Sequence, residues 1–391
     1  MKKSILTALL IVFCVSPACA DKAASPIPIG IGVALTGNVA IYGQEQMIGA
    51  GIAEKYCNDR GGVHGTPVKI VSRDTGADEA GAIDAFQNLI EKNKVVGIVG
   101  PTLSQQCFSA CPVANRRKVP VLAPSDTVSG IPQIGEYIGR VSSPNTLVIP
   151  PVITHALKMN PQIRKMAILY AEDNALHVSE SEVFLKTAKS LNLHIAAIQK
   201  FRTTDTDFTS QVEEVLKAQV DLVTVSGFAV DGGTLVRQLR RNGYKGMIAG
   251  GNGFNSPNLF PVCGKDCHDI IVAQAYSPAA KNPVNEAFVK QYRKQMKKDP
   301  SQFAAQSFAA VQVIVEGLRK VEQTTGKKIA RMEIDPARQE LNRAIRSGSY
   351  MTPLGEITLD EEGEIHQKTF YVLQVKMDKD GKSGHFVHQE K

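Results

Sequence analysis

Two short hydroxyl-rich segments hold the residues best suited to bind a small ligand. Thr102 and Ser104 lie in the first segment, and Ser125 and Thr127 lie in the second. Each segment follows a run of apolar, β-branched residues. The first also precedes a helical stretch, so its backbone N–H groups and hydroxyls can bind an anion, and a carboxylate suits that place. Simple helix capping by Thr102 or Ser104 is the alternative explanation.

Catalytic signatures do not assemble from the remaining residues. The eight His are scattered, and the chain has no G-x-S-x-G, H-E-x-x-H or Walker lysine motif. Gly30, Gly32 and Gly37 lack the spacing of a dinucleotide site, and the first two fall inside a predicted strand. We therefore expect a binding protein rather than an enzyme, with no cofactor and no metal.

Strands and helices alternate along the chain in two series, and these elements must position the polar segments. The apolar runs of the first series are residues 27–35, 68–72, 95–99 and 119–122, and the second series extends from 165–171 to 247–249. This alternation predicts an α/β fold of two doubly wound lobes, each with a parallel sheet covered on both faces. Ligands bind beyond the carboxyl ends of such strands, where both polar segments lie.

The last third of the chain adds helices and a β-rich end. Phe303 and Phe308 belong to an apolar stripe at helical spacing, which is typical of a core. A charged turn at residues 360–363 predicts a hairpin. The predicted elements are helices over residues 283–298 and 302–324 and strands over 357–359 and 369–376.

Length and composition are those of an ordinary globular protein. The chain has 391 residues, 43% hydrophobic and 21% charged, with a formal net charge of +7. This length suits two lobes better than one continuous core. A weak positive charge without clustered Lys and Arg gives no reason to expect nucleic acid or a membrane surface as a partner.

Residues 1–20 have the pattern of a cleaved export signal. Two lysines precede an apolar run over residues 5–15, and small residues favour cleavage after Ala20. The run is too short to span a bilayer, and no later stretch reaches about 18 apolar residues. A lipoprotein acylated at Cys19 is the alternative, although Ser16 stands where an aliphatic residue is usual. We expect an exported protein.

Five cysteines remain after the signal, so at least one has no intramolecular partner. Cys263 and Cys267 lie in a turn-rich stretch where a short disulfide is plausible in an exported protein. A zinc site would enlist His268 and Asp266, but no second ligand pair has metal-site spacing. The remaining cysteines, whose pairing the sequence leaves open, are Cys57, Cys107 and Cys111.

An ordered series of segments resembles the periplasmic leucine/isoleucine/valine-binding proteins of ABC importers, which are type I periplasmic binding proteins. The segments in this order are specific to the family, whereas no single segment would identify it. It covers nearly the whole chain after the signal. The matching segments are residues 29–37, Tyr42-Gly43, 58–65 (Asn-Asp-Arg-Gly-Gly-Val-His-Gly), 98–104, 123–127 and 233–239.

The resemblance implies two lobes joined by a three-segment hinge that closes on a ligand. It also implies a periplasmic protein, expected as a monomer, that binds an amino acid, branched-chain or similar, and delivers it to an ABC permease in the inner membrane. The implied crossings are residues 141–146, 273–277 and 352–356. The implied lobes are residues 21–143 with 277–352, and 144–276 with 353–391.

The resemblance also implies roles in the first lobe. The Ser104 hydroxyl and the Thr102 backbone would hold the ligand α-carboxylate. The Ser125 backbone and the Thr127 hydroxyl would face the carboxylate and the ammonium. Tyr42 would pack on the ligand side chain.

The second lobe departs from the family pattern. Phe228 and Ala175, or a near neighbour of Ala175, stand where branched-chain members have tyrosines, and Asn252 stands where they have the Glu that pairs with the ligand ammonium. Loss of a carboxylate partner is costly for a buried ammonium unless another acid, Asp231 or Asp126, replaces it. A non-zwitterionic carboxylate or amide ligand is therefore an alternative, and a ligand-sensing module is another.

Overall fold

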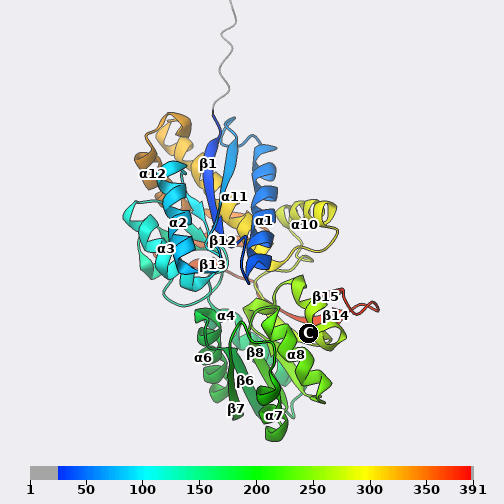
Figure 1. Cartoon of the computed structure of the whole chain (residues 1–391). Helices are drawn as coiled ribbons and strands as arrows, with labels where there is room; N and C mark the ends of the chain where they lie inside the picture. Colours follow the sequence, from blue (N-terminus) through cyan, green and yellow to red (C-terminus); the bar gives the residue numbers. More distant parts are fainter. Residues whose placement is uncertain (1–24, 389–391) are drawn as a thin grey trace, which may run out of the picture.

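The computed structural model describes residues 25–388, and the predicted signal peptide lies outside this range. Two α/β lobes lie one above the other in Figure 1, with the N-terminal strands in the upper lobe and the green segments in the lower one. None of the helices within the described range has the length and apolar character needed to cross a bilayer.

The first lobe contains a five-stranded parallel sheet in the order β2-β1-β3-β4-β5. Apolar side chains fill both of its faces, with Ile29 and Ile31 in one core and Ile98 and Val121 in the other. Strand β5 was not predicted, because its sequence Ile-Gly-Arg does not form an apolar run. The strands are β1 (Ile27–Val33), β2 (Val68–Asp74), β3 (Ile98–Val99), β4 (Val121–Ala123) and β5 (Ile138–Arg140).

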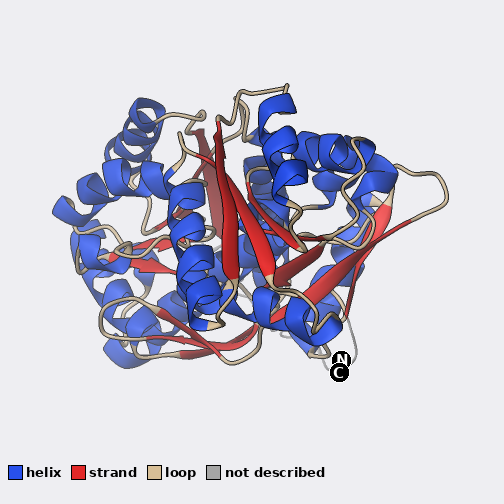
Figure 2. Ribbon diagram, turned by 90° about the horizontal axis from the view of Figure 1, so that it is seen from below, coloured by secondary structure: helices blue, strands red, loops and turns tan. Residues whose placement is uncertain are grey.

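Helices cover both faces of this sheet (Figure 2). The central one, α11, is buried along most of its length and packs against α1. The packing is so close that a Cβ at Gly49 would overlap the Ala304 carbonyl oxygen. The helices of this lobe are α1 (Ala40–Asn58), α2 (Glu79–Gln87), α3 (Ser104–Arg116), α10 (Pro283–Met296), α11 (Gln302–Thr325) and α12 (Ile334–Arg346).

The second lobe repeats the plan around a seven-stranded sheet in the order β15-β14-β10-β9-β8-β6-β7. Its strands β6 to β10 are parallel, and β14 and β15 add an antiparallel edge. The strands are β6 (Lys165–Ala171), β7 (His194–Phe201), β8 (Leu222–Ser226), β9 (Met247–Gly250), β10 (Ile271–Gln274), β14 (Tyr371–Met377) and β15 (Gly384–His388). The helices are α4 (Asn145–Val148), α5 (Pro150–Met159), α6 (Ala175–Ser190), α7 (Thr209–Ala218), α8 (Asp231–Arg241) and α9 (Phe260–Cys263).

The third crossing lies later in the chain than the expected residues 352–356. The predicted charged turn closes a hairpin whose apolar side chains Ile357, Leu359 and Ile365 lie in the core of the first lobe, so the chain stays there until β14. A sequence pattern does not reveal this tertiary contact. The hairpin belongs to a small antiparallel sheet of β11 (Ser349–Thr352), β12 (Gly355–Leu359) and β13 (Ile365–Gln367).

Gln367 forms hydrogen bonds with the first and second crossings, so the three crossings lie side by side. Its Nε2 donates to the Ala275 carbonyl at 2.6 Å in the second crossing, and its Oε1 accepts from the Ser143 hydroxyl at 3.4 Å in the first. We therefore place the third crossing just after Gln367. The predicted fold class, two parallel-sheet lobes with a three-segment hinge, is confirmed.

Candidate functional site

A narrow cavity of about 20 Å³ lies between the lobes, beyond the carboxyl ends of the strands. Its wall brings together residues that are far apart in sequence, from Tyr42 to Phe303. Six of the seven predicted ligand residues line it: Tyr42, Thr102, Ser104, Ser125, Phe228 and Asn252. Leu103, Leu176, Gly253 and Phe303 complete the wall.

Ser104 is the first residue of α3, so free N–H groups of the first helical turn lie beside its side chain. The residue is buried, and its hydroxyl has no hydrogen-bond partner in the described part of the chain. The capping explanation does not hold, because the N-cap residue is Leu103 and no side chain caps the helix. A hydroxyl and open N–H groups at a helix start can bind a carboxylate.

Thr102 and Ser125 use their side chains to build the site rather than to face the cavity. The Thr102 hydroxyl donates to Gln46 Oε1 at 2.7 Å and accepts from the Ala34 N–H at 2.9 Å. Gln46 Nε2 donates to Ser125 Oγ at 2.8 Å, and the Ser125 hydroxyl donates to the Thr102 carbonyl at 2.7 Å. Only the backbones of Thr102 and Ser125 are therefore free to meet a ligand.

Three aromatic rings form the apolar wall. Tyr42 lies 5.5 Å from Phe228 and 4.8 Å from Phe303, measured between ring centroids. Its hydroxyl accepts from the Ala229 N–H and donates to the Gly253 carbonyl, both at 2.8 Å, which ties the first lobe to the second. Burial raises the pKa of Tyr42 well above its ordinary value, so the phenol stays protonated.

Phe303 and Leu176 are lining residues that the sequence did not reveal. Phe303 begins the apolar stripe of α11, which we interpreted as core, and it extends into the cavity at the helix start. Leu176, which follows Ala175 at the start of α6, is part of the cavity wall. A hydrophobic stripe does not show where a core ends and a cavity begins.

Thr127, the seventh predicted residue, lines a second, very small cavity of about 10 Å³, which shares Asn252 with the first. The Thr127 hydroxyl is buried and has no hydrogen-bond partner in the described structure. Polar groups from both lobes and the hinge surround it. The other polar lining residues are Ser143, Asn145, Glu180, Asn252, Gln302 and Gln306.

The Asn252 side chain is already engaged on its acceptor side. Its Oδ1 accepts from Gln302 Nε2 at 2.8 Å and from Asn255 Nδ2 at 3.3 Å. Only its amide N–H₂ remains for a ligand, and that group donates. Asn252 therefore does not offer an acceptor to an ammonium.

Neither acid proposed from the sequence as a substitute lines either cavity. Asp126 is buried, and desolvation raises its pKa to about 8, although the charge of Arg140 and a hydrogen bond from the Ser125 backbone oppose the rise. Asp231 is buried at the start of α8, where desolvation raises its pKa to about 6 and the charge of His177 opposes the rise.

Glu180 is the acid that does line the site, and the sequence analysis missed it. It is buried in α6 on the same helix face as His177 and Phe184. Its Oε1 accepts from the Asn252 N–H at 2.7 Å, and its Oε2 makes a short hydrogen bond with the Ser226 hydroxyl. The signal in the sequence that could have revealed Glu180 is its position among apolar residues at helical spacing in α6.

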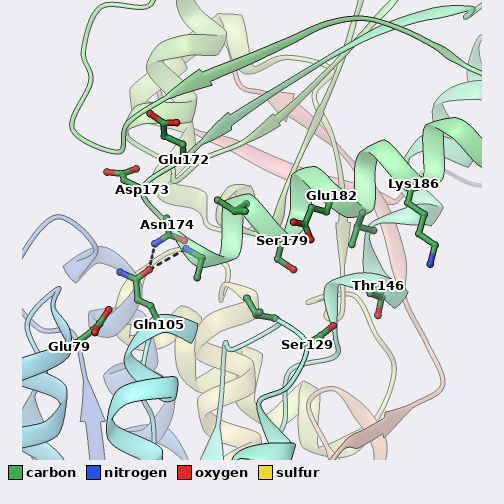
Figure 3. A pocket seen from close by; sticks show the side chains of 14 residues that line it. Glu79, Gln105, Ser129, Thr146, Glu172, Asp173, Asn174, Ser179, Glu182 and Lys186 are labelled. Atoms are coloured by element: carbon green, nitrogen blue, oxygen red, sulfur yellow. Dashed lines mark hydrogen bonds between the residues drawn. The ribbon is translucent and has the colours of Figure 1, made fainter.

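A larger groove of about 750 Å³ opens at the edge of the cleft. In Figure 3, Gln105 of the first lobe meets the start of α6, with its Oε1 accepting from Asn174 Nδ2 at 3.0 Å and from the Ala175 N–H at 3.4 Å. Acidic side chains such as Glu172 and Glu182 stand along the groove. None of the seven predicted residues lines it, so we place the candidate site in the enclosed cavities.

Cys263 and Cys267 form a disulfide with a Cα–Cα distance of 5.3 Å. The zinc alternative has no remaining ligands there, since Asp266 pairs with Arg241 and His268 Nδ1 accepts from the Met377 N–H. No cluster of three or more metal-ligating residues occurs between residues 25 and 388. The other three cysteines are buried and free, and the Sγ atoms of Cys107 and Cys111 lie 2.7 Å apart.

Two α/β lobes that share an enclosed cavity at the strand ends form the architecture of a binding protein that closes around its ligand. A model of the periplasmic binding protein family matches residues 26–382, and the chain belongs to this family. Its members and structural neighbours are substrate-binding proteins, so the chain is a binding protein and not an enzyme.

Proteins similar to this chain share its fold but bind different ligands. The leucine-, isoleucine-, valine-, threonine- and alanine-binding protein of Pseudomonas aeruginosa is 26% identical over 90% of this chain and 91% of its own. The leucine binding protein LivK of Thermotoga maritima has a TM-score of 0.80 at 24% identity, covering 92% of this chain and 97% of its own. A solute binding protein of a Rhodopseudomonas palustris ABC transporter, solved with 3,4-dihydroxybenzoic acid, has a TM-score of 0.81 at 22% identity, covering 93% and 96%. The predicted resemblance to Leu/Ile/Val-binding proteins is confirmed.

Proposed function

We propose that this chain binds an amino acid between its two lobes and delivers it to the permease of an ABC importer. The observation that carries the proposal is the placement of two hydroxyls beyond the carboxyl ends of neighbouring strands: Ser104 lines the cavity at the start of α3, and the buried Thr127 hydroxyl has no hydrogen-bond partner in the described structure. These hydroxyls and the N–H groups at the start of α3 suit a carboxylate. The aromatic wall beside them suits an apolar side chain.

A thermal-shift screen tests this proposal, because a ligand that binds only the folded state raises the unfolding temperature. The panel contains amino acids, their deaminated acids, benzoates and amides. We expect a saturable shift with at least one apolar amino acid and no shift with the amide of that amino acid, which lacks the carboxylate. The proposal would be contradicted if none of the carboxylates in the panel binds.

A second candidate function is the binding of an aromatic acid that lacks an ammonium. Asn252 in place of an acid and three aromatic rings in the wall favour this candidate. The dihydroxybenzoate complex of a neighbour with the same fold adds to it. A benzoate that binds more tightly than every amino acid of the panel would establish it.

The cellular location and the partner of this protein are inferred from residues 1–20 and from the family. We propose export to the periplasm with cleavage after Ala20, a monomeric mature protein, and the inner-membrane permease as partner. Mass spectrometry of the exported protein tests the cleavage site, and the expected mature start is Asp21. A chain that retains its lysine-containing start would contradict the proposal.

A further inference from the structure

We propose that Glu180 supplies the negative charge that holds the ligand's ammonium group, in place of the acid missing at position 252. This inference rests on the proposed function and narrows the ligand to an α-amino acid. Glu180 comes from α6, whereas residue 252 follows β9, so the chain would provide the same charge from a different element.

The local backbone holds the Glu180 carboxylate at the cavity. The Asn252 N–H donates to its Oε1 at 2.7 Å. At the preceding residue, Gly251, a Cβ would overlap the Glu180 carboxylate. Only glycine at position 251 therefore lets the Glu180 carboxylate approach this loop. The loop that lacks an acid at position 252 thus accommodates the carboxylate of Glu180.

The charge of Glu180 is not neutralised by a lysine or arginine. Within residues 25–388, the single basic group at ion-pair distance is His177, whose Nδ1 lies 3.7 Å from Glu180 Oε2. His177 also interacts with Asp231, a second buried acid. One histidine carries at most one positive charge against two carboxylates, so a ligand cation would balance the cluster.

The second cavity also offers acceptors of the right kind. Thr127 Oγ1, Asn145 Oδ1 and Gln306 Oε1 are buried there without hydrogen-bond partners, and Glu180 shares the same wall. An ammonium donates three hydrogen bonds and accepts none, so it matches a wall of acceptors. Because this cavity adjoins the Ser104 cavity at Asn252, a ligand whose ammonium is close to its carboxylate would contact both walls once the lobes open to admit it.

The test compares matched ligands on matched variants of the mature protein. Calorimetric titrations use L-leucine and L-phenylalanine with their deaminated partners, 4-methylpentanoate and 3-phenylpropanoate. Wild-type protein should bind at least one amino acid about tenfold or more tightly than its deaminated partner. Glu180→Gln should remove this preference by weakening amino-acid binding at least about tenfold, with little effect on the deaminated acid.

Two further variants separate a charge effect from damage to the fold. Glu182→Gln removes an exposed acid from the same helix and should retain wild-type preference. Gly251→Ala keeps every charge but displaces Glu180, so it should also reduce the preference.

The outcomes distinguish this inference from the proposed function. A Glu180→Gln protein that keeps the wild-type preference would overturn the role of Glu180 and leave the proposed function standing. A wild-type protein that binds only the deaminated acids would overturn both the role of Glu180 and amino-acid binding, and only the carboxylate site would stand. Absence of binding to all four compounds and to benzoate would overturn both.

Discussion

At the scale of single residues, the proposed site contains side chains that hold its loops in place and others that we propose to bind the ligand. Gln46 ties Thr102 and Ser125 together, so their side chains fix the loops while Ser104 and Thr127 keep free hydroxyls. The sequence located these four residues because polar segments at strand ends are exceptional in an apolar sheet. Glu180 was not located, because its role depends on an approach to Gly251 from another element.

Tyr42 provides a test of the contact between the lobes. Tyr42→Phe keeps the ring against Phe228 but leaves the Ala229 N–H without its acceptor in the closed protein. An unsatisfied buried donor costs about 1–3 kcal/mol, so we expect ligand affinity to fall by about tenfold, measured by calorimetry. Tyr56→Phe, on the same helix against Phe308, is the control and should bind as wild type does. Equal affinities of the two variants would contradict the bridging role.

At the scale of elements, the packing of α1 against α11 sets the position of Tyr42 and Phe303, one on each helix. The strand–helix alternation predicted these helices because their apolar faces repeat at helical spacing. The short strand β5 and the hairpin β12–β13 could not be placed from the sequence, since a few residues carry too little pattern to show which lobe they join.

Two glycines of α1 provide a matched test of this packing. A Cβ at Gly49 would overlap the Ala304 carbonyl, whereas a Cβ at Gly51 would meet nothing within 4 Å. We expect Gly49→Ala to lower the free energy of unfolding by about 1–3 kcal/mol through overpacking. Gly51→Ala should raise it by about 0.5–1 kcal/mol through better helix propensity. Denaturant unfolding measures the free energy of unfolding of both variants. A Gly49→Ala protein as stable as wild type would show that α1 and α11 can move apart to accommodate the added methyl group at no cost.

At the scale of the whole molecule, a carboxylate is buried where the two lobes meet. Glu45 of the first lobe accepts from the Ser256 hydroxyl and from Asn258 Nδ2 of the second, both at 2.9 Å. Desolvation raises the pKa of Glu45 to about 7, and its hydrogen bonds only partly oppose the rise. Exposure on opening would return this pKa toward 4.5, so closure takes up a proton between these values.

Ligand binding should therefore depend on pH through Glu45. A carboxyl with a raised pKa in the closed protein stabilises closure fully below about pH 4.5, and this contribution is lost as the pH rises through about 7. We expect wild-type affinity to be several-fold higher at pH 6 than at pH 8. Glu45→Gln should flatten the dependence of affinity on pH. Asp126 and Asp231 are present in both proteins, so any contribution they make to the pH dependence is the same in wild type and variant. A variant with the wild-type pH dependence would assign the proton to another group.

The central claim is that the ligand carboxylate binds between the lobes at Ser104 and Thr127. The most direct measurement is a calorimetric titration of Ser104→Ala/Thr127→Ala with the compound that gives the largest thermal shift on wild type. A hydrogen bond to a charged group contributes about 1.5–3 kcal/mol, so affinity should fall by at least about a hundredfold, with the unfolding temperature of the ligand-free protein nearly unchanged. Unchanged affinity in the double variant would contradict the claim.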